Sequence, residues 1–205
     1  MRSTSAGEWF LPPDGGAGSL VRVADGVGAD AVRRIRDLGL PGLLPIGNVV
    51  SANGQIWLRT PQPPGPTLDE ALRAPLTGAD GLAVCAGLVR AVAGLHSRGL
   101  THGRLDGEGV LLDPEGAVQV VLLSPGDSDP ADDLTAVAGL ARAMAAAWCD
   151  RDAEEELLLR RCAAMLEHRG PQAALDVLPA QPPASGDGLR RLAQKWTPPL
   201  PGAAC

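Results

Sequence analysis

A long apolar helix beginning after Thr77 is the strongest constraint that this sequence places on its fold. Thr77 and Asp80 have the spacing of a capping box, which marks the start of a helix. Behind them, apolar residues recur every three or four positions and share one helical stripe: Leu82, Cys85, Leu88, Val89, Val92 and Leu95. This helix leads the chain directly into the loop that contains His102.

The chain before this helix is predicted to form a small region that contains strands. Residues 19–23 are a candidate strand, and residues 28–38 have the apolar spacing of an amphipathic helix. Two apolar runs, residues 43–50 and 55–59, flank an Asn53-Gly54 pair, which predicts a hairpin. The proline-rich residues 61–66 cannot sustain regular hydrogen bonding and are predicted to form a hinge.

The chain after the His102 loop is predicted to be mainly helical. Asp113 to Gly116 separate two apolar runs and so predict a second hairpin. Asp129 followed by Pro130 predicts a helix start, and the run from there to Trp148 is apolar on both faces, so we expect it to be central and buried. In the next helix, Leu158, Cys162, Met165 and Leu166 are the expected core side. The expected ranges are 110–112 and 118–123 for the hairpin, 129–148, 152–169 and 171–178 for helices, and 189–196 for a last helical turn.

Composition limits the class of protein. With 205 residues and 45% hydrophobic side chains, the chain can bury one core, or form one domain divided into two small lobes. A net charge of −6 argues against a nucleic-acid partner. There is no signal-peptide pattern and no uncharged apolar run long enough for a membrane, so we expect a soluble, cytoplasmic protein. The cysteines form no C-x-x-C pair, which favours reduced thiols, either buried or half-exposed: Cys85, Cys149, Cys162 and Cys205.

Residues 95–112, LHSRGLTHGRLDGEGVLL, have the spacing of the protein-kinase catalytic loop, H-R-D-L-x-x-x-N followed by apolar residues. The chain therefore resembles a eukaryotic-like (Hanks-type) serine/threonine protein kinase domain in degenerate form. Its richness in Ala, Gly, Pro and Arg is typical of a GC-rich, bacterial genome. Residues 40–44 resemble the connection that follows the kinase αC helix, and residues 158–178 resemble the last helices of the kinase C-lobe.

The resemblance implies an α+β, reduced bilobal fold. Its N-lobe would be small, with strands and one αC-like helix, and its C-lobe would be mainly helical. The expected divisions are a flexible lead over 1–14, the N-lobe over 15–60, the hinge over 61–66, the C-lobe over 67–179, and a proline-rich tail with a short helix over 180–205. In the family, the loop residues matched by His102 and Leu105 serve architecture. An aspartate matched by Asp133, or by Asp132, accepts hydrogen bonds from the loop backbone.

When the chain is matched to the kinase catalytic loop in this way, the residues that carry kinase chemistry are missing. Arg104 stands at the catalytic aspartate, and a guanidinium cannot accept a proton. Gly109 stands at the magnesium-binding asparagine, and Asp106 lies between them. The D-F-G element falls at Leu122, or at Ser124, Pro125 and Gly126 if two residues are inserted. Asp127 and Asp129 lie beyond it as alternative metal ligands, or as helix caps and solvated acids.

The groups that hold ATP phosphates are also altered. The single lysine, Lys195, lies beyond the kinase-like helices, so there is no strand lysine to bind the phosphates. Arg22 is a possible substitute, or a solvated strand arginine, and Val32 falls near the position of the glutamate that pairs with the lysine. Gly16 and Gly18 belong to a stretch that resembles the kinase glycine-rich loop and would be possible nucleotide contacts, or part of a flexible lead.

We therefore interpret the chain as a pseudokinase, an inactive protein-interaction or regulatory scaffold in signalling. It would bind no cofactor, and its partner would be a protein such as an active kinase or a kinase substrate. The alternative is an atypical nucleotide-binding switch or weak phosphotransferase that uses ATP and magnesium. A third possibility is a helical adaptor with two hairpins. Trp9 and Trp196 are candidate partner contacts, or else the ends of the chain that carry them pack onto its own surface, whereas Trp57 and Trp148 are expected in the core. Arg98 and Arg104 would offer a weak basic spot.

Overall fold

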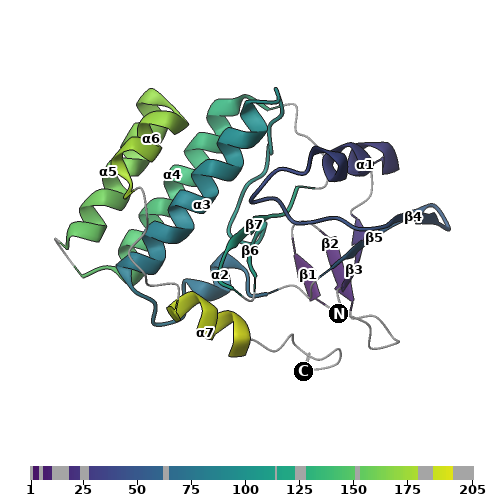
Figure 1. Ribbon diagram of the computed structural model, residues 1–205, viewed down its shortest axis with the longest axis horizontal. Coiled ribbons are helices and arrows are strands. Elements are labelled where there is room, and N and C mark those ends of the chain that lie inside the picture. Colours follow the sequence, from purple (N-terminus) through teal and green to yellow (C-terminus); the bar gives the residue numbers. More distant parts are fainter. Residues whose placement is uncertain are drawn as a thin grey trace.

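The computed structural model describes residues 2–4, 7–10, 19–23, 28–61, 65–113, 115–122, 128–150, 153–179 and 187–195. It has a five-stranded antiparallel sheet at one end and a group of packed helices at the other (Figure 1). The α+β class predicted from the sequence is confirmed at this level.

The sheet has the strand order β1 (Arg2–Thr4), β2 (Gly7–Phe10), β3 (Ser19–Val23), β5 (Gln55–Thr60) and β4 (Val49–Ala52). The turn between β4 and β5 is Asn53-Gly54, with φ of 52° and 72°, as the tight hairpin turn requires. The predicted hairpin is confirmed, although its first strand begins at Val49. Strands β1 and β2 lie within residues 1–14, so the expected flexible lead is wrong at residues 2–4 and 7–10.

The two faces of the sheet differ. Val21 and Val23 of β3 point to the inner face and are buried, whereas Leu20 and Arg22 point to the outer face. The helix α1 (Ala29–Leu38) contributes Val32 to the inner core. Trp9 also belongs to this core and is 2% exposed, so of its two alternatives, contact with a partner is wrong and packing against the chain itself is found. Its burial follows from its pairing with Val21 in the β2–β3 register.

The helical part is built around α3 (Gly78–His96), which packs against α4 (Pro130–Trp148), α5 (Glu154–Arg169) and α6 (Pro171–Val177) (Figure 1). The capping box predicted at α3 is present, with Thr77 N 3.0 Å from an Asp80 carboxylate oxygen. The short α2 (Leu68–Ala71) has a second capping box, Thr67 with Glu70, which the sequence analysis missed. The last described helix is α7 (Asp187–Lys195).

The expectations for α4 and α5 are only partly met. Helix α4 buries one face, including Met144 and Trp148, whereas Ala146 and Ala147 are exposed, which costs little because alanine has a small apolar area. In α5, Leu159 is buried and Leu158 is half-buried, so the core face is rotated from the expected one. Cys162 and Leu166 are buried as expected, and Met165 is half-buried.

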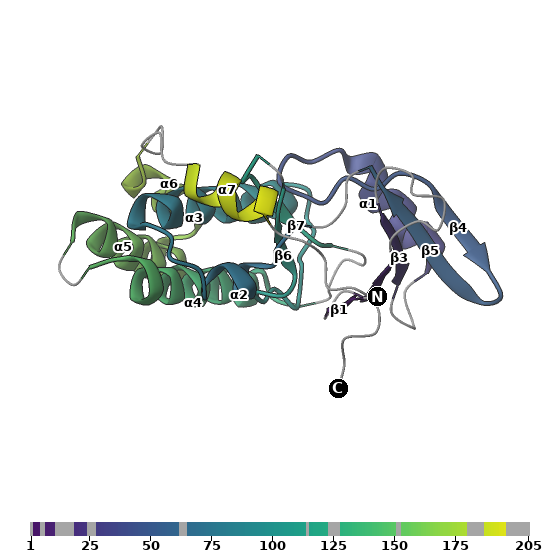
Figure 2. The ribbon, with the colours of Figure 1, turned by 90° about the horizontal axis from the view of Figure 1, so that it is seen from below.

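A hairpin of β6 (Val110–Leu112) and β7 (Val118–Val120) lies between the sheet and the helices (Figure 2). Alternate side chains face alternate cores: Leu111 and Val121 join the sheet core, while Leu112, Val120 and Leu122 join the helical core. The segment after α1 is bonded to β7, with Val120 N 2.7 Å from Gly42 O and Leu44 N 2.9 Å from Val120 O. The hairpin therefore connects the two parts of the molecule through both backbone and side chains.

A glycine allows the segment after α1 to approach α3 closely. Gly42 has φ of +81°, and a β-carbon there would lie 2.9 Å from Ala91 Cβ, so glycine allows this close approach to α3.

Within the described residues, α3 alone is long and apolar enough to match a membrane span. However, 67% of that segment is buried inside the protein, as in the core helix of a soluble protein.

Candidate functional site

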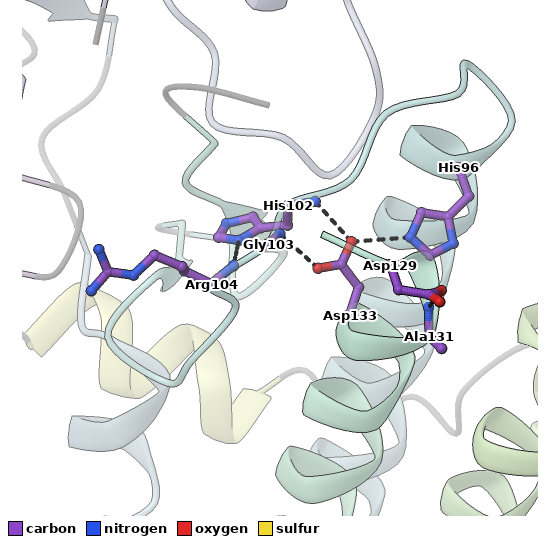
Figure 3. Close-up of polar contacts among 7 residues, drawn as sticks. All are labelled: His96, His102, Gly103, Arg104, Asp129, Ala131 and Asp133. Carbon is purple, nitrogen blue, oxygen red and sulfur yellow. Dashed lines mark hydrogen bonds and ion pairs between the residues drawn. The ribbon is translucent and has the colours of Figure 1, made fainter. Parts of the chain in front are cut away.

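The His102 loop, residues 101–109, is held by one buried carboxylate. Asp133, in the first turn of α4, is 1% exposed. It accepts hydrogen bonds from His102 N at 2.7 Å and Gly103 N at 2.8 Å, and it lies 3.0 Å from His96 Nε2 (Figure 3). Hydrogen bonds to a charged acceptor are stronger than neutral ones, so this arrangement fixes the loop backbone.

The start of α4 places Asp133 against the loop. Asp129 caps the helix by accepting from Ala131 N at 2.8 Å (Figure 3). Pro130 occupies the first turn, where no N–H is needed. Acidic side chains near a helix N-terminus are also favoured by the helix dipole. Asp132 is exposed, so the backbone acceptor is Asp133 and not its neighbour.

Both ring nitrogens of His102 take part in hydrogen bonds. Its Nε2 lies 3.1 Å from the Val121 carbonyl, which can only accept, so Nε2 carries the proton. Its Nδ1 accepts from Arg104 N at 3.3 Å. Burial lowers the pKa of His102, more than the Val121 carbonyl and the nearby carboxylates raise it. The imidazole is therefore a neutral structural group with no nitrogen available to take a substrate proton.

The outward positions of the loop carry exposed charges. Arg104 is exposed, and its guanidinium points away from Asp133 (Figure 3). Leu105 is buried at 7% exposure, and Asp106 accepts from Gly109 N at 2.8 Å, which closes the turn that leads to β6. Gly109 itself offers only backbone, and its carbonyl accepts from Val121 N at 2.8 Å. An arginine that is always protonated cannot act as a base at this position.

Acidic residues meet where the His102 loop contacts α2. Asp69 N donates to Gly107 O at 3.3 Å, and a β-carbon on Gly107 would collide with the Asp69 carboxylate. Burial raises the pKa of Asp69, and repulsion from Asp106 and Glu108 raises it further.

In the part of the chain that the structure describes, no group of three or more His, Cys, Asp or Glu side chains has metal-site geometry.

The candidate phosphate ligand Arg22 lies on the outer face of the sheet. Its Nε is 2.8 Å from a Glu8 carboxylate oxygen and its Nη1 is 2.9 Å from Gln55 Oε1. The sheet separates these contacts from the His102 loop, because the residues of β3 that face inward are Val21 and Val23. Arg22 is thus not brought together with the loop. Gly16 and Gly18 lie outside the described residues.

The first of the two possible D-F-G registers places a leucine in the core. Leu122 is 2% exposed and packs in the helical core, while Val121 packs in the sheet core. Ser124, Pro125 and Gly126 of the second register lie outside the described residues, as does Asp127. Asp129 is accounted for as the cap of α4.

No protein-family model matches the chain, and no curated protein matches it. The interpretation of the site therefore depends on its geometry.

Two features, one in the site and one in the sheet core beside it, were not predicted from the sequence. Asp133 also pairs with His96, 37 residues away, and no local pattern marks that pair. Trp9 fills the inner face of the sheet together with Leu58 and Val121. An alternation of inward and outward residues around Trp9 would have been its only signal, and β2 is too short to display one.

Proposed function

We propose that the chain is a catalytically inactive, protein-kinase-like module that acts as a protein-interaction or regulatory scaffold in signalling. The observation that carries this proposal is the exposed Arg104 in a loop whose backbone is held by Asp133. A kinase-type loop needs a carboxylate at that position to accept the proton of the substrate hydroxyl. A guanidinium has no acceptor lone pair and repels a cationic magnesium site.

The arrangement of the described elements is compatible with a reduced bilobal kinase fold. A small antiparallel sheet with one helix, α1, is followed by the buried α3, the His102 loop, the β6–β7 hairpin and the helices α4 to α6. The kinase lysine belongs to the third strand and its glutamate to the helix that follows. In this chain the corresponding inward positions, Val21 and Val23 on β3 and Val32 on α1, are apolar and buried.

Magnesium and ATP do not fit the described residues at these positions. A nucleotide bound between the sheet and the His102 loop would need a cation for its phosphates and carboxylate oxygens for the metal. The sheet core contributes Trp9, Leu58 and Val121 there instead, and Leu122 is turned into the helical core. Opening this space would expose apolar surface to water, which is unfavourable. These residues support a role that depends on the shape of the fold.

The partner proposed for the module is another protein, such as an active kinase or a kinase substrate. Loss of the chemical groups alongside retained packing fits a fold that is kept for its shape, since a fold by itself never specifies chemistry. The charged side chains Arg104, Asp106 and Glu108 of this loop are exposed, so a protein partner could reach them.

A nucleotide titration followed by a phosphotransfer assay tests the proposal. The unfolding midpoint of the purified protein would be measured against rising ATP and ADP, with and without magnesium, beside an active kinase as the positive control. We expect no shift in the midpoint, because a ligand that does not bind the native state cannot stabilise it. We also expect no label to pass from γ-labelled ATP to the protein or to a peptide.

Two outcomes would contradict the proposal in different ways. A midpoint that rises with ATP, without transfer, would indicate the nucleotide-switch alternative. Transfer of label above the level of a heat-denatured sample would indicate an atypical phosphotransferase, and Asp106→Asn and Asp127→Asn would then identify its acid. Loss of transfer in only one of these variants would name the residue that takes part.

A further inference from the structure

The helical core contains a pair of cysteine thiols in contact. Cys85 lies on α3 and Cys162 on α5, 77 residues apart in sequence, and their Sγ atoms are 3.5 Å apart. Both residues are fully buried. A disulfide has an S–S bond of about 2.05 Å, so the two sulfurs need to approach by only about 1.5 Å. Movements of this size are within the range of a side-chain rotation and a small helix shift.

We propose that Cys85 and Cys162 form a reversible disulfide when the folded protein meets a two-electron oxidant such as hydrogen peroxide. This modification site is independent of the function proposed for the His102 loop. The covalent link would join the middle of α3 to α5 and would enclose the His102 loop, the β6–β7 hairpin and the whole of α4 in one closed loop of chain.

The surroundings of the two sulfurs give them different roles. The contact with Cys162 and, after it, burial raise the pKa of Cys85, whereas the same thiol–thiol contact lowers the pKa of Cys162. The thiolate is the reactive form of cysteine. In the proposed reaction Cys162 attacks the oxidant and Cys85 resolves the product, and the disulfide itself depends on the contact between the two sulfurs.

The reaction proceeds in two balanced steps. The Cys162 sulfur attacks one peroxide oxygen, the O–O bond breaks, and the other oxygen leaves as water with the thiol proton, which gives a sulfenic acid. The Cys85 sulfur then attacks the Cys162 sulfur, the S–S bond forms, and the hydroxyl group leaves as water with the proton of Cys85. Two thiols and one peroxide thus yield one disulfide and two water molecules.

Cys149 provides an internal comparison. It is half-buried at the C-terminal end of α4, so it is more accessible than the pair. Partial burial raises its pKa, and the nearby Glu155, Glu156 and Asp150 raise it further. Cys149 combines better access with a less reactive thiol, and we expect it to remain reduced under mild oxidation that converts the buried pair.

The test uses the full chain with Cys149→Ala and Cys205→Ala, which leaves the pair as the only thiols. The folded protein would be treated with hydrogen peroxide, then denatured in the presence of an alkylating reagent and measured by mass spectrometry. We expect neither thiol to be alkylated, and we expect one linked peptide that contains Cys85 and Cys162 and that separates on reduction. The unfolding midpoint of the oxidised protein should rise by several degrees, up to about 10 °C, because the link closes a long loop of the unfolded chain.

Removal of one partner supplies the matched control. Cys85→Ala in the same background should lose both the linked peptide and the rise in midpoint, and Cys162 should then accumulate sulfenic or sulfinic acid. If that variant does not fold, the protein with Cys149→Ala and Cys205→Ala alone still shows whether the disulfide forms. Two alkylated thiols after oxidation of the folded parent would overturn the proposal. So would a disulfide that forms only when the oxidant is added in urea.

Discussion

The two sides of the His102 loop differ in burial: the inner side is hydrogen-bonded to a buried carboxylate, and the outer side carries exposed charges. On the inner side, a single buried carboxylate, Asp133, takes hydrogen bonds from two consecutive backbone N–H groups and from His96. On the outer side, Arg104, Asp106 and Glu108 are all exposed. The buried carboxylate on the inner side holds the loop against α4, and the exposed side chains on the outer side are the ones that another molecule can reach.

The difference shows that the position of the loop and the charges on its surface depend on different residues. A buried donor that loses its acceptor costs about 1 to 3 kcal/mol, whereas most surface substitutions change stability by less than about 0.5 kcal/mol. We therefore expect the fold to tolerate substitution of an exposed outer residue such as Arg104, and not to tolerate substitution of Asp133. Substitutions on the two sides should separate stability from chemistry.

The largest effect is expected for Asp133→Ala. The change leaves the N–H groups of His102 and Gly103 without their acceptor in a buried setting, and it removes the partner of His96. We expect the free energy of unfolding to fall by about 3 to 5 kcal/mol, measured by urea denaturation.

Asp132→Ala is the matched control for that variant, because Asp132 is exposed in the same turn of α4. It should cost less than about 1 kcal/mol, through its interaction with the helix dipole. Hydrogen exchange gives a local readout: the amides of His102 and Gly103 should lose protection in the Asp133 variant alone. Equal losses of stability in both variants would show that the carboxylate of Asp133 does not hold the loop.

A second large effect is expected at the inner face of the sheet. Trp9→Ala removes the largest side chain of the sheet core and leaves a cavity, so we expect a loss of about 3 kcal/mol in the free energy of unfolding. Trp57→Ala, on the outer face where Trp57 is half-buried against Phe10, should cost less. If the two losses are equal, or if the Trp9 variant is stabilised by ATP, the sheet core is not the closed space described above.

The features that could be predicted from the sequence have local signals. The capping box at Thr77, the Asp129-Pro130 helix start and the Asn53-Gly54 turn each depend on residues within four positions of one another. These features are stabilised by contacts between residues that are neighbours in the chain, so the sequence alone shows all the residues that they need.

The features that could not be predicted depend on distant pairing. Trp9 is buried because β2 pairs with β3, and a strand as short as β2 shows no clear alternation. The core face of α5 turns toward Leu159 because α4 and α6 determine which side is covered, which the helical period alone does not decide. In the site, the acceptor role of Asp133 could be narrowed to two adjacent residues, but its pairing with His96 could not be foreseen.

A pH-dependent effect of intermediate size is expected for His102. Burial lowers the pKa of this imidazole in the folded protein relative to the ordinary value of 6.5. As the pH falls below about 6.5, the unfolded chain takes up a proton before the native one does, so wild-type stability falls, with a slope of at most about 1.4 kcal/mol per pH unit. Above that range the contribution of His102 is constant. His102→Gln should remove this slope.

The measurement is urea denaturation of both proteins at a series of pH values between neutral and mildly acidic. All other titrating groups are shared, so the difference between the curves isolates His102. His168→Gln, at an exposed position of α5, is the control and should keep the wild-type slope. A His102 variant whose pH dependence matches that of the wild type would mean that the ring is not held neutral.

The smallest effect on stability is expected for Arg104→Asp, which places an acid at this position on the outer side of the loop. Arg104 is exposed, so the free energy of unfolding should change by less than about 0.5 kcal/mol, as should that of the matched variant Arg98→Asp. Phosphotransfer should remain absent, because Gly109 and the buried Leu122 still provide no magnesium ligands and Arg22 still lies across the sheet. A gain of phosphotransfer in the Arg104 variant, but not in the Arg98 variant, would show that one charge on the outer side was the whole obstacle.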